Sequence, residues 1–103
     1  MKRLLITGAA GGLGSIARRR LKGLAETLRL SDIAELGAAG PQEEVVPCDL
    51  SDFAAVRNLV EGCDGIIHYG GISVERPWEE ILPANIQGTY NLYEAARQAG
   101  VPR

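Results

Sequence analysis

The sequence predicts an α/β fold in which helices flank a parallel β-sheet, and three observations lead to this prediction. Short β-rich runs alternate along the chain with longer stretches of helical period, as they do in βαβ units. A glycine-rich loop separates the first β-rich run from the first helical stretch, and Asp32 closes the second run. We therefore expect the first half of a doubly wound sheet, with strand order 3-2-1-4, in a single domain over residues 1–103.

Four strands are predicted, at residues Arg3–Thr7, Thr27–Ser31, Glu44–Cys48 and Gly65–Tyr69. The first carries a continuous apolar run that stops at Gly8, as expected of a strand that is buried on both faces. The third contains Pro47, which has no N–H to donate to a sheet. This third strand therefore suits the edge of the sheet better than its centre.

Two helices are predicted between these strands. The first runs from Gly12 to Leu24, and its apolar residues recur at helical spacing, so that one face should pack on the sheet. These residues are Leu13, Ile16, Ala17, Leu21 and Leu24. The second begins at an N-cap, Ser51, and stops at Gly62. Its inward-facing residues are Phe53, Val56, Leu59 and Val60.

A third helix follows the fourth strand. It is expected from about Trp78 to Gly100, with Pro83 within about one turn of its start. Its predicted apolar stripe comprises Leu82, Ile86, Tyr90 and Tyr93, flanked by Ile81, Leu92, Ala96 and Ala99. Residues 34–42 are rich in glycine and alanine without any period, and we expect them to form a surface loop.

Composition excludes several classes of protein. The chain carries 11 basic and 13 acidic residues, a net charge of −2, so nucleic acid and anionic membranes are not expected partners. No apolar run approaches the roughly 20 residues of a membrane span, and no signal peptide is visible. We expect a cytoplasmic protein whose two cysteines, Cys48 and Cys63, are reduced thiols.

The strongest chemical signal is the loop at residues 7–14, Thr-Gly-Ala-Ala-Gly-Gly-Leu-Gly. Gly8 permits a tight turn, Gly11 allows a pyrophosphate to approach the backbone, and Gly14 lets the helix pack closely on the strand. The free N–H groups and the dipole of the helix N-terminus favour phosphate. Glycine loops also form plain turns, but this one follows a strand, opens a helix and precedes Asp32 by about 20 residues. We therefore predict a partial dinucleotide-binding domain of the Rossmann type.

Asp32 indicates which dinucleotide binds. A carboxylate at the end of the second strand accepts hydrogen bonds from the adenosine ribose and repels a 2′-phosphate, so NAD is favoured over NADP. The alternative is a strand-end aspartate that only caps the following loop. His68, the sole histidine, has no second histidine or cysteine at ligand spacing. We expect it to be packed or hydrogen-bonded, and we predict no metal site.

The glycine loop resembles that of the extended short-chain dehydrogenases/reductases, the NAD-dependent epimerase/dehydratase family. Within this family the sequence resembles the bacterial uronate dehydrogenases over nearly the whole chain. The segments that carry this resemblance are residues 30–33, 48–50, 63–68, 70–78 and 90–97. The stretch Ser-Val-Glu-Arg-Pro-Trp at residues 73–78 is much more specific than the glycine loop.

The resemblance implies an oxidoreductase that oxidises the C1 hydroxyl of galacturonate or glucuronate to an aldarolactone, with hydride transfer to NAD. It implies cofactor-binding roles for Gly8, Gly11, Gly12, Leu13 and Gly14 at the pyrophosphate, Asp32 and Ile33 at the adenosine ribose, Asp49 and Leu50 at the adenine, and Tyr69, Gly70 and Gly71 beside the cofactor. It also implies that Ser73 faces the uronate substrate and that Asn85 lies in the helix that supports the fourth strand. The alternatives are that Ser73 is an ordinary loop serine and that Asn85 is a helix residue hydrogen-bonded to neighbouring backbone.

Catalysis in the family depends on a Tyr-x-x-x-Lys pair, in which the lysine lowers the tyrosine pKa so that the phenolate can take the hydroxyl proton. The pair is absent from these residues, since neither Lys2 nor Lys22 follows a tyrosine by four positions. The sequence stops at Arg103, where the family chain would enter its fifth strand. We therefore expect an N-terminal, cofactor-binding part that is inactive alone and has no catalytic residue of its own.

Two other functions remain open. In the first, the chain is part of an NAD-dependent nucleotide-sugar epimerase or dehydratase of the same family. In the second, it is a non-catalytic half-domain that binds a dinucleotide or assembles with copies of itself. Without a fifth strand, the edge beside Gly65–Tyr69 would be uncovered and would invite pairing, so a homo-oligomer is expected.

Overall fold

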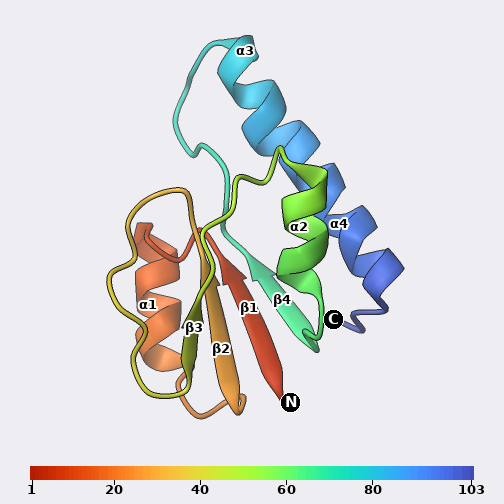
Figure 1. The fold of residues 1–103 in the computed structure, drawn as a ribbon. Helices are drawn as coiled ribbons and strands as arrows, with labels where there is room; N and C mark the ends of the chain where they lie inside the picture. Colours follow the sequence, from red (N-terminus) through yellow and green to blue (C-terminus); the bar gives the residue numbers. More distant parts are fainter.

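The predicted parallel sheet is confirmed in the computed structural model, which describes residues 1–103. The strands are β1 (Arg3–Thr7), β2 (Thr27–Ser31), β3 (Glu43–Val45) and β4 (Gly65–His68). They lie in the order β3-β2-β1-β4, and all are parallel (Figure 1). In the register, Leu5 of β1 pairs with Arg29 of β2 on one side and with Ile66 of β4 on the other. The carboxyl ends of the strands therefore share one edge of the sheet.

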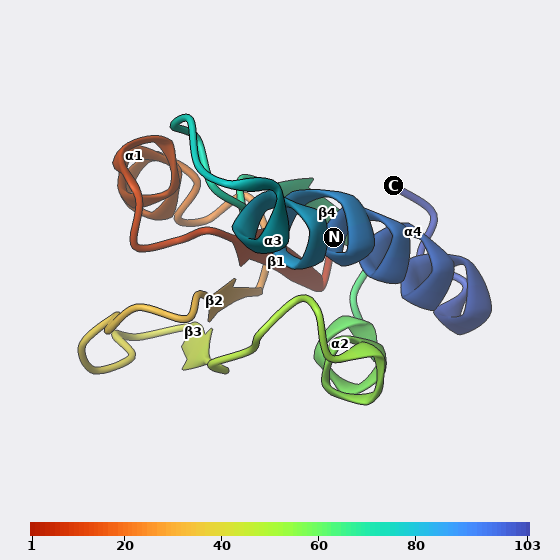
Figure 2. The same cartoon turned by 90° about the horizontal axis from the view of Figure 1, so that it is seen from above.

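Helices cover both faces of this sheet (Figure 2). One face packs on α1 (Gly12–Arg20), and the other packs on α2 (Phe53–Val60) and α4 (Gly88–Ala99). Alternate side chains of β1 supply both cores: Leu4 and Ile6 join the cluster under α1, whereas Leu5 joins the cluster under α2 and α4. All three are almost completely buried, as predicted for a strand with both faces covered.

Helix α1 is shorter than predicted and packs with a different face. It ends at Arg20 instead of Leu24, and Gly23 follows with a left-handed φ of +89°. Small residues, Gly14 and Ala17, face the sheet, so the helix lies close to it. The prediction that all five apolar residues face inward was wrong, since Leu13, Ile16 and Leu24 are exposed.

The third strand is also shorter than predicted, but its place at the edge of the sheet is confirmed. It begins at Glu43 and ends at Val45, before Pro47. The chain nevertheless stays beside β2, because the N–H of Val46 donates to the carbonyl of Leu30 at 2.9 Å. This extension carries the backbone to the carboxyl edge of the sheet.

Helix α2 begins one residue later than predicted. Its N-cap is Asp52, whose carboxylate accepts a hydrogen bond from the N–H of Ala55 at 3.2 Å, and not Ser51. Ser51 instead donates to Asp49 through its backbone N–H and its hydroxyl. The inward face is as predicted at Val56, Leu59 and Val60, which are fully buried, while Phe53 is partly buried.

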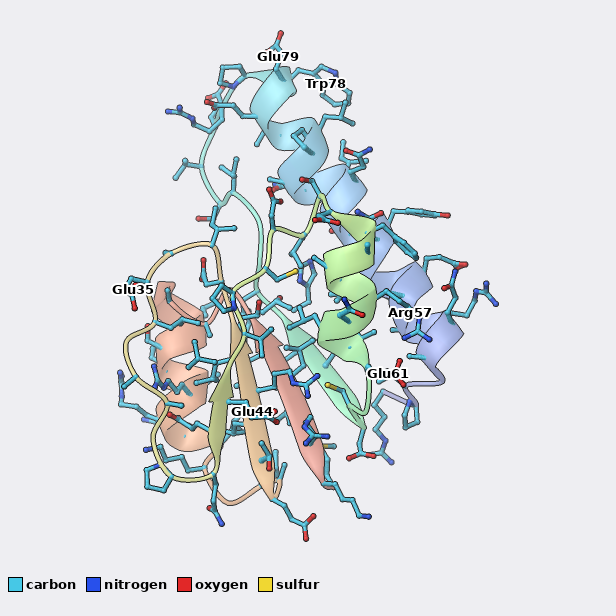
Figure 3. The ribbon with its side chains drawn as sticks, in the orientation of Figure 1. Glu35, Glu44, Arg57, Glu61, Trp78 and Glu79 are labelled. Carbon is cyan, nitrogen blue, oxygen red and sulfur yellow. The ribbon has the colours of Figure 1, made fainter.

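The third helix is a continuous rod with a wider turn in its middle. It comprises α3 (Trp78–Ile81), a π-helical segment η1 (Leu82–Gln87) and α4. Pro83 lies in η1, where its missing N–H removes one α-helical hydrogen bond. The rod runs past the carboxyl edge of the sheet, with Trp78 and Glu79 at its far end (Figure 3). None of the helices is both long enough and apolar enough to cross a membrane.

The predicted apolar stripe of this helix does not face the sheet. Its members Leu82, Ile86, Tyr90 and Tyr93 are all exposed, so this stripe lies on the outer face of the helix. The inward stripe is instead Gly88, Asn91, Leu92 and Ala95. The physical reason is close approach, since a Cβ on Gly88 would lie 3.0 Å from the Cβ of Leu50. A residue without a side chain therefore occupies this contact, and the tyrosines face outward.

Candidate functional site

A cavity of about 520 Å³ opens at the carboxyl edge of the sheet. It gathers every predicted site residue: Gly8, Gly11, Gly12, Leu13, Gly14, Asp32, Ile33, Asp49, Leu50, Tyr69, Gly70, Gly71 and Ser73 all line it. Six further residues line the cavity although the sequence did not predict them as site residues: Thr7, Ser31, Ala34, Cys48, Ile72 and Ala84. Most of these directly precede or follow a predicted residue. The rule that loops at the carboxyl ends of parallel strands form the site would have included them.

The glycine turn between β1 and α1 cannot accept larger residues at two positions. Gly8 has a φ of +66°, and a Cβ there would lie 2.5 Å from the carbonyl carbon of Tyr69. A Cβ on Gly14 would lie 2.0 Å from the carbonyl oxygen of Gly8. These distances are far below a van der Waals contact. They agree with the predicted roles of a tight turn and of close helix packing.

The N-terminus of α1 is open toward the cavity. Its N-cap, Gly11, has extended backbone and no side chain to satisfy the first N–H groups, and the first turn contains no acidic residue. A Cβ on Gly12 would meet no atom within 4 Å, so the space in front of the helix is free. The unpaired N–H groups and the positive end of the helix dipole can therefore accept an anion of phosphate type.

Asp32 links the glycine turn to the loop after β2. One carboxylate oxygen accepts the N–H of Ala10, and the other accepts the N–H of Ala34, both at 3.0 Å. The second of these bonds is the loop cap that we considered as the alternative role for Asp32. Each carboxylate oxygen can accept a further hydrogen bond. The carboxylate is thus held in a fixed position beside the helix N-terminus, with acceptor capacity left for a ligand hydroxyl.

Asp49 and Leu50 form the wall of the cavity beyond β3. The backbone N–H and the hydroxyl of Ser51 donate to one oxygen of Asp49 at 2.9 and 2.8 Å, and these hydrogen bonds lower the pKa of the Asp49 carboxyl. Leu50 is fixed from the other side, because its carbonyl accepts the side-chain amide of Asn91 at 2.9 Å. The wall therefore carries one ionised carboxylate and one apolar side chain.

The loop after β4 is held by Asn85. The side chain of Asn85 accepts the N–H of Ile72 at 2.6 Å and donates to the carbonyl of the same residue at 2.8 Å. Gly71 makes this pairing possible: its φ is +122°, and a Cβ there would lie 2.9 Å from Oδ1 of Asn85. Asn85 thus bonds to backbone, as the alternative interpretation had it, and this backbone lies directly before Ser73. Ser73 itself is exposed at the cavity rim.

One polar atom of the cavity has no partner. The hydroxyl oxygen of Ser31 is buried and makes no hydrogen bond, although Ser31 lines the cavity. Buried hydroxyls are nearly always bonded, so this one is available to a ligand or to an ordered water. Together with the open helix N-terminus and the free acceptor capacity of Asp32, it fits a ligand with phosphate and hydroxyl groups. No group of three or more His, Cys, Asp or Glu residues is placed to hold a metal ion.

The glycine turn, the open helix N-terminus and the strand-end carboxylate define a Rossmann fold of the dinucleotide-binding class. Comparison with known proteins gives the particular family. The chain belongs to the NAD dependent epimerase/dehydratase family, which matches residues 4–103.

Curated relatives in this family include several uronate dehydrogenases. The chain is 64% identical to the uronate dehydrogenase of Pseudomonas putida over 102 residues, which are 98% of this chain and 38% of that protein. It is 63% identical to the uronate dehydrogenase of Agrobacterium fabrum over 103 residues, which are 100% of this chain and 39% of that protein. The chain therefore spans somewhat more than a third of the length of these relatives.

Solved structures agree with this assignment. A uronate dehydrogenase from Agrobacterium tumefaciens, in a Y136A mutant complexed with NAD, is 63% identical with a TM-score of 0.95, and the match covers 97% of this chain and 38% of that one. A glucuronic acid dehydrogenase from Chromohalobacter salexigens is 65% identical with a TM-score of 0.96, over 99% and 38% of the two chains. The fold and the family are thus the same in these proteins and in this chain.

Proposed function

We propose that these residues bind NAD as the cofactor-binding part of an oxidoreductase. The observation that carries the proposal is the single cavity at the carboxyl edge, where the uncapped N-terminus of α1 and the fixed carboxylate of Asp32 lie side by side. The helix N-terminus would take the pyrophosphate, and Asp32 would take the adenosine ribose hydroxyls. Bound NAD would supply a hydride acceptor, and the residues of this chain would bind and orient it.

Calorimetric titration of NAD into the chain tests this proposal. We expect saturable binding of one NAD per chain, and we expect AMP, which lacks the nicotinamide half, to compete for the same site. Substitution of Gly12 by a bulky residue separates binding from folding, because its Cβ would project into free space in front of the helix. Gly12→Leu should weaken NAD binding while leaving the thermal unfolding temperature nearly unchanged. A chain that is folded but binds no NAD would contradict the proposal.

We infer that the whole enzyme acts on a uronate. The 61–64% identity to uronate dehydrogenases, against 27% to MoeE5 in its complex with UDP-glucuronic acid and NAD, favours a free hexuronate over a sugar nucleotide. Ser73 supports this substrate class, since its hydroxyl lies at the cavity rim beyond the loop that Asn85 fixes. The reaction would oxidise the C1 hydroxyl of galacturonate or glucuronate to an aldarolactone.

A chimera tests the substrate directly. Residues 1–103 would replace the matching segment of the Pseudomonas putida uronate dehydrogenase, which supplies the rest of the enzyme. We expect NADH formation with galacturonate or glucuronate, and a raised KM in the Ser73→Ala chimera. Conversion of UDP-sugars without uronate oxidation would favour the nucleotide-sugar alternative. A chimera that binds NAD but oxidises neither uronate would overturn the uronate proposal and leave the cofactor proposal standing.

We further propose that the chain assembles with copies of itself. The exposed residues Leu82, Ile86, Tyr90 and Tyr93 form an apolar stripe along the outer face of the third helix, and β4 lies at an edge of the sheet. The sheet edge is partly covered, because the N–H of Ile66 donates to the carbonyl of Arg103 at 2.9 Å. The stripe is therefore the better candidate for the contact. Sedimentation should show a dimer or larger species that Tyr90→Ser weakens, and a monomer at high concentration would contradict the proposal.

A further inference from the structure

His68 lies between the cavity and the third helix, and hydrogen bonds connect it to both sides. Its Nδ1 is 2.7 Å from Oγ1 of Thr7, at the end of β1. The same Thr7 oxygen accepts the backbone N–H of Gly70 at 3.0 Å. On the far side of the ring, Nε2 is 3.5 Å from Oγ1 of Thr89, which is the outer limit for a hydrogen bond. A chain of polar groups thus runs from the cavity lining to α4.

The directions of these hydrogen bonds follow from the donors available. The N–H of Gly70 can only donate, so the Thr7 oxygen accepts it. The single hydroxyl hydrogen of Thr7 then has one acceptor within reach, Nδ1 of His68. Thr7 is only 1% exposed, so bulk solvent does not surround its hydroxyl. The Thr7 hydroxyl is satisfied only when Nδ1 accepts, so this arrangement favours a neutral ring that carries its hydrogen on Nε2.

Packing leaves little room for this arrangement to relax. A Cβ placed on Gly70 would lie 3.2 Å from the Thr7 oxygen and 3.4 Å from Cε1 of His68. The hydroxyl and the imidazole ring therefore lie directly against the Gly70 backbone. Gly70 also lines the cavity in which we place the cofactor. A single side chain, that of Thr7, thus connects the ring by hydrogen bonds to a group that lines the cavity.

We propose that His68 is a positioning residue for cofactor binding: its neutral ring holds the Thr7 hydroxyl in the orientation that fixes the N–H of Gly70, and protonation of the ring weakens this hold. This inference rests on the proposed binding of NAD. The added proton comes from solvent and occupies Nδ1. Nδ1–H then donates to the same Thr7 oxygen that accepts the N–H of Gly70, so the two donors share its lone pairs, and the Thr7 hydroxyl hydrogen loses its acceptor and must turn. The hydrogen bond from Gly70 is weakened as a result. NAD should therefore bind more tightly to the form with neutral His68.

The surroundings of the ring favour the neutral form. The groove on its open side, about 310 Å³ in volume, is lined on α4 by Tyr93 and Arg97 and at the chain end by Arg103. On the other side of the ring, β1 contributes the Thr7 hydroxyl. None of the residues that line the groove has a carboxylate side chain. Burial lowers the pKa of His68 below its ordinary value. The switch should therefore act on the acidic side of neutrality.

Nitrogen NMR can read the ring directly, because His68 is the only histidine in the sequence. In the free chain we expect the Nε2–H tautomer, and we expect the amide signal of Gly70 to follow the titration of His68. With saturating NAD, the pKa of His68 should fall by about 0.5 units or more, which corresponds to about threefold weaker NAD binding to the protonated form. The same threefold change should appear when NAD affinity is measured as a function of pH.

Three substitutions separate positioning from simple packing. Thr7→Val removes the hydroxyl, and the Gly70 amide should then no longer follow His68. Thr89→Val removes only the 3.5 Å contact between Thr89 and Nε2 of His68 and is the matched control. It should leave unchanged both the dependence of the Gly70 amide signal on His68 titration and the affinity for NAD. His68→Asn places an amide oxygen near the position of Nδ1, so Thr7 keeps an acceptor and NAD should still bind, without the dependence on pH.

Several results would overturn the proposal. These are an Nδ1–H tautomer, a Gly70 amide that ignores the His68 titration, or a His68 pKa that is the same with and without bound NAD. A chain that binds no NAD at all would overturn the proposed function and with it the coupling to the cofactor. The Gly70 amide would in that case still decide whether the hydrogen-bond link exists, so the two failures are distinguishable.

Discussion

Replacement of Asp32 by alanine removes two sets of hydrogen bonds that can be measured apart. The first set is internal, since the carboxylate accepts the N–H groups of Ala10 and Ala34, both at 3.0 Å. Both bonds lie at the surface, where each contributes about 0.5–1 kcal/mol to folding. The second set would be made to the adenosine ribose of NAD. We therefore expect a modest loss of stability, of about 1–2 kcal/mol, and a separate loss of NAD affinity.

The loss of affinity follows from the charge of the acceptor. A hydrogen bond to a charged group contributes about 1.5–3 kcal/mol, and water partly compensates for its removal. A net loss of about 2–3 kcal/mol corresponds to a dissociation constant about 30-fold to 150-fold higher. NADP should behave differently, because the carboxylate that disfavours its 2′-phosphate is gone. The preference for NAD over NADP should fall by at least about tenfold.

Isothermal titration of both nucleotides into the wild type, Asp32→Ala and Asp32→Asn provides the measurement. Asp32→Asn keeps one acceptor oxygen and the shape of the side chain while it removes the charge, so it separates charge from packing. If NAD and NADP weakened by the same factor in Asp32→Ala, the carboxylate would act only as a cap for the following loop. That result would refute its assignment to the ribose.

Three further predictions concern stability. Gly14→Ala should destabilise the fold by more than about 2 kcal/mol in urea unfolding, because its Cβ would lie 2.0 Å from a carbonyl oxygen. Gly12→Ala is the control, since its Cβ would meet no atom within 4 Å and the change should be nearly neutral. Asn85→Ala should cost about 1–2 kcal/mol, since it removes two hydrogen bonds of 2.6 and 2.8 Å to one backbone residue, and should speed amide exchange after β4. The hydrogen bond from Arg18 lowers the pKa of Glu43 in the folded chain. The stabilisation of the fold by this pair is therefore complete above the pKa that Glu43 has in the unfolded chain, and it is lost as pH falls from about 5 downward. Glu43→Gln should flatten that acid limb.

Each of these predictions has a contrary outcome. Equal unfolding midpoints for Gly14→Ala and Gly12→Ala would show that close helix packing does not limit position 14. Unchanged exchange at Ile72 in Asn85→Ala would show that the loop is held by other contacts. An acid limb of the same steepness in Glu43→Gln would assign the loss of stability at low pH to other carboxylates.

The order of the sheet and the position of the site followed from local sequence signals. The run up to Gly8, the glycine turn and Asp32 each obey rules that depend on neighbours in sequence, namely strand period, backbone conformation and helix-end chemistry. Parallel topology then brings the strand ends to one edge, and this is why all the predicted site residues line one cavity. No long-range contact had to be known for this step.

Helix orientation could not be predicted in the same way. Apolar periodicity places Leu13 on the inner face of α1 and groups Tyr90 with the apolar stripe of the third helix, yet both are exposed. The inner faces carry Gly14 and Gly88 because the helices approach the backbone too closely for larger side chains. The hydrophobic pattern of a helix does not show how closely the helix approaches its neighbours. The expectation that His68 is hydrogen-bonded is confirmed, but its partner could not be predicted, since Thr7 and His68 are 61 positions apart.

The central claim, that the edge cavity is an NAD site, is tested most directly by mapping NAD on the amide NMR spectrum of the chain. We predict that saturating NAD moves the amide signals of Gly12, Asp32 and Gly70, which lie in three separate segments around the cavity. Signals at the far end of the sheet, such as that of Leu28, should stay in place. An unchanged spectrum, or shifts confined to the groove beside β4, would contradict the claim.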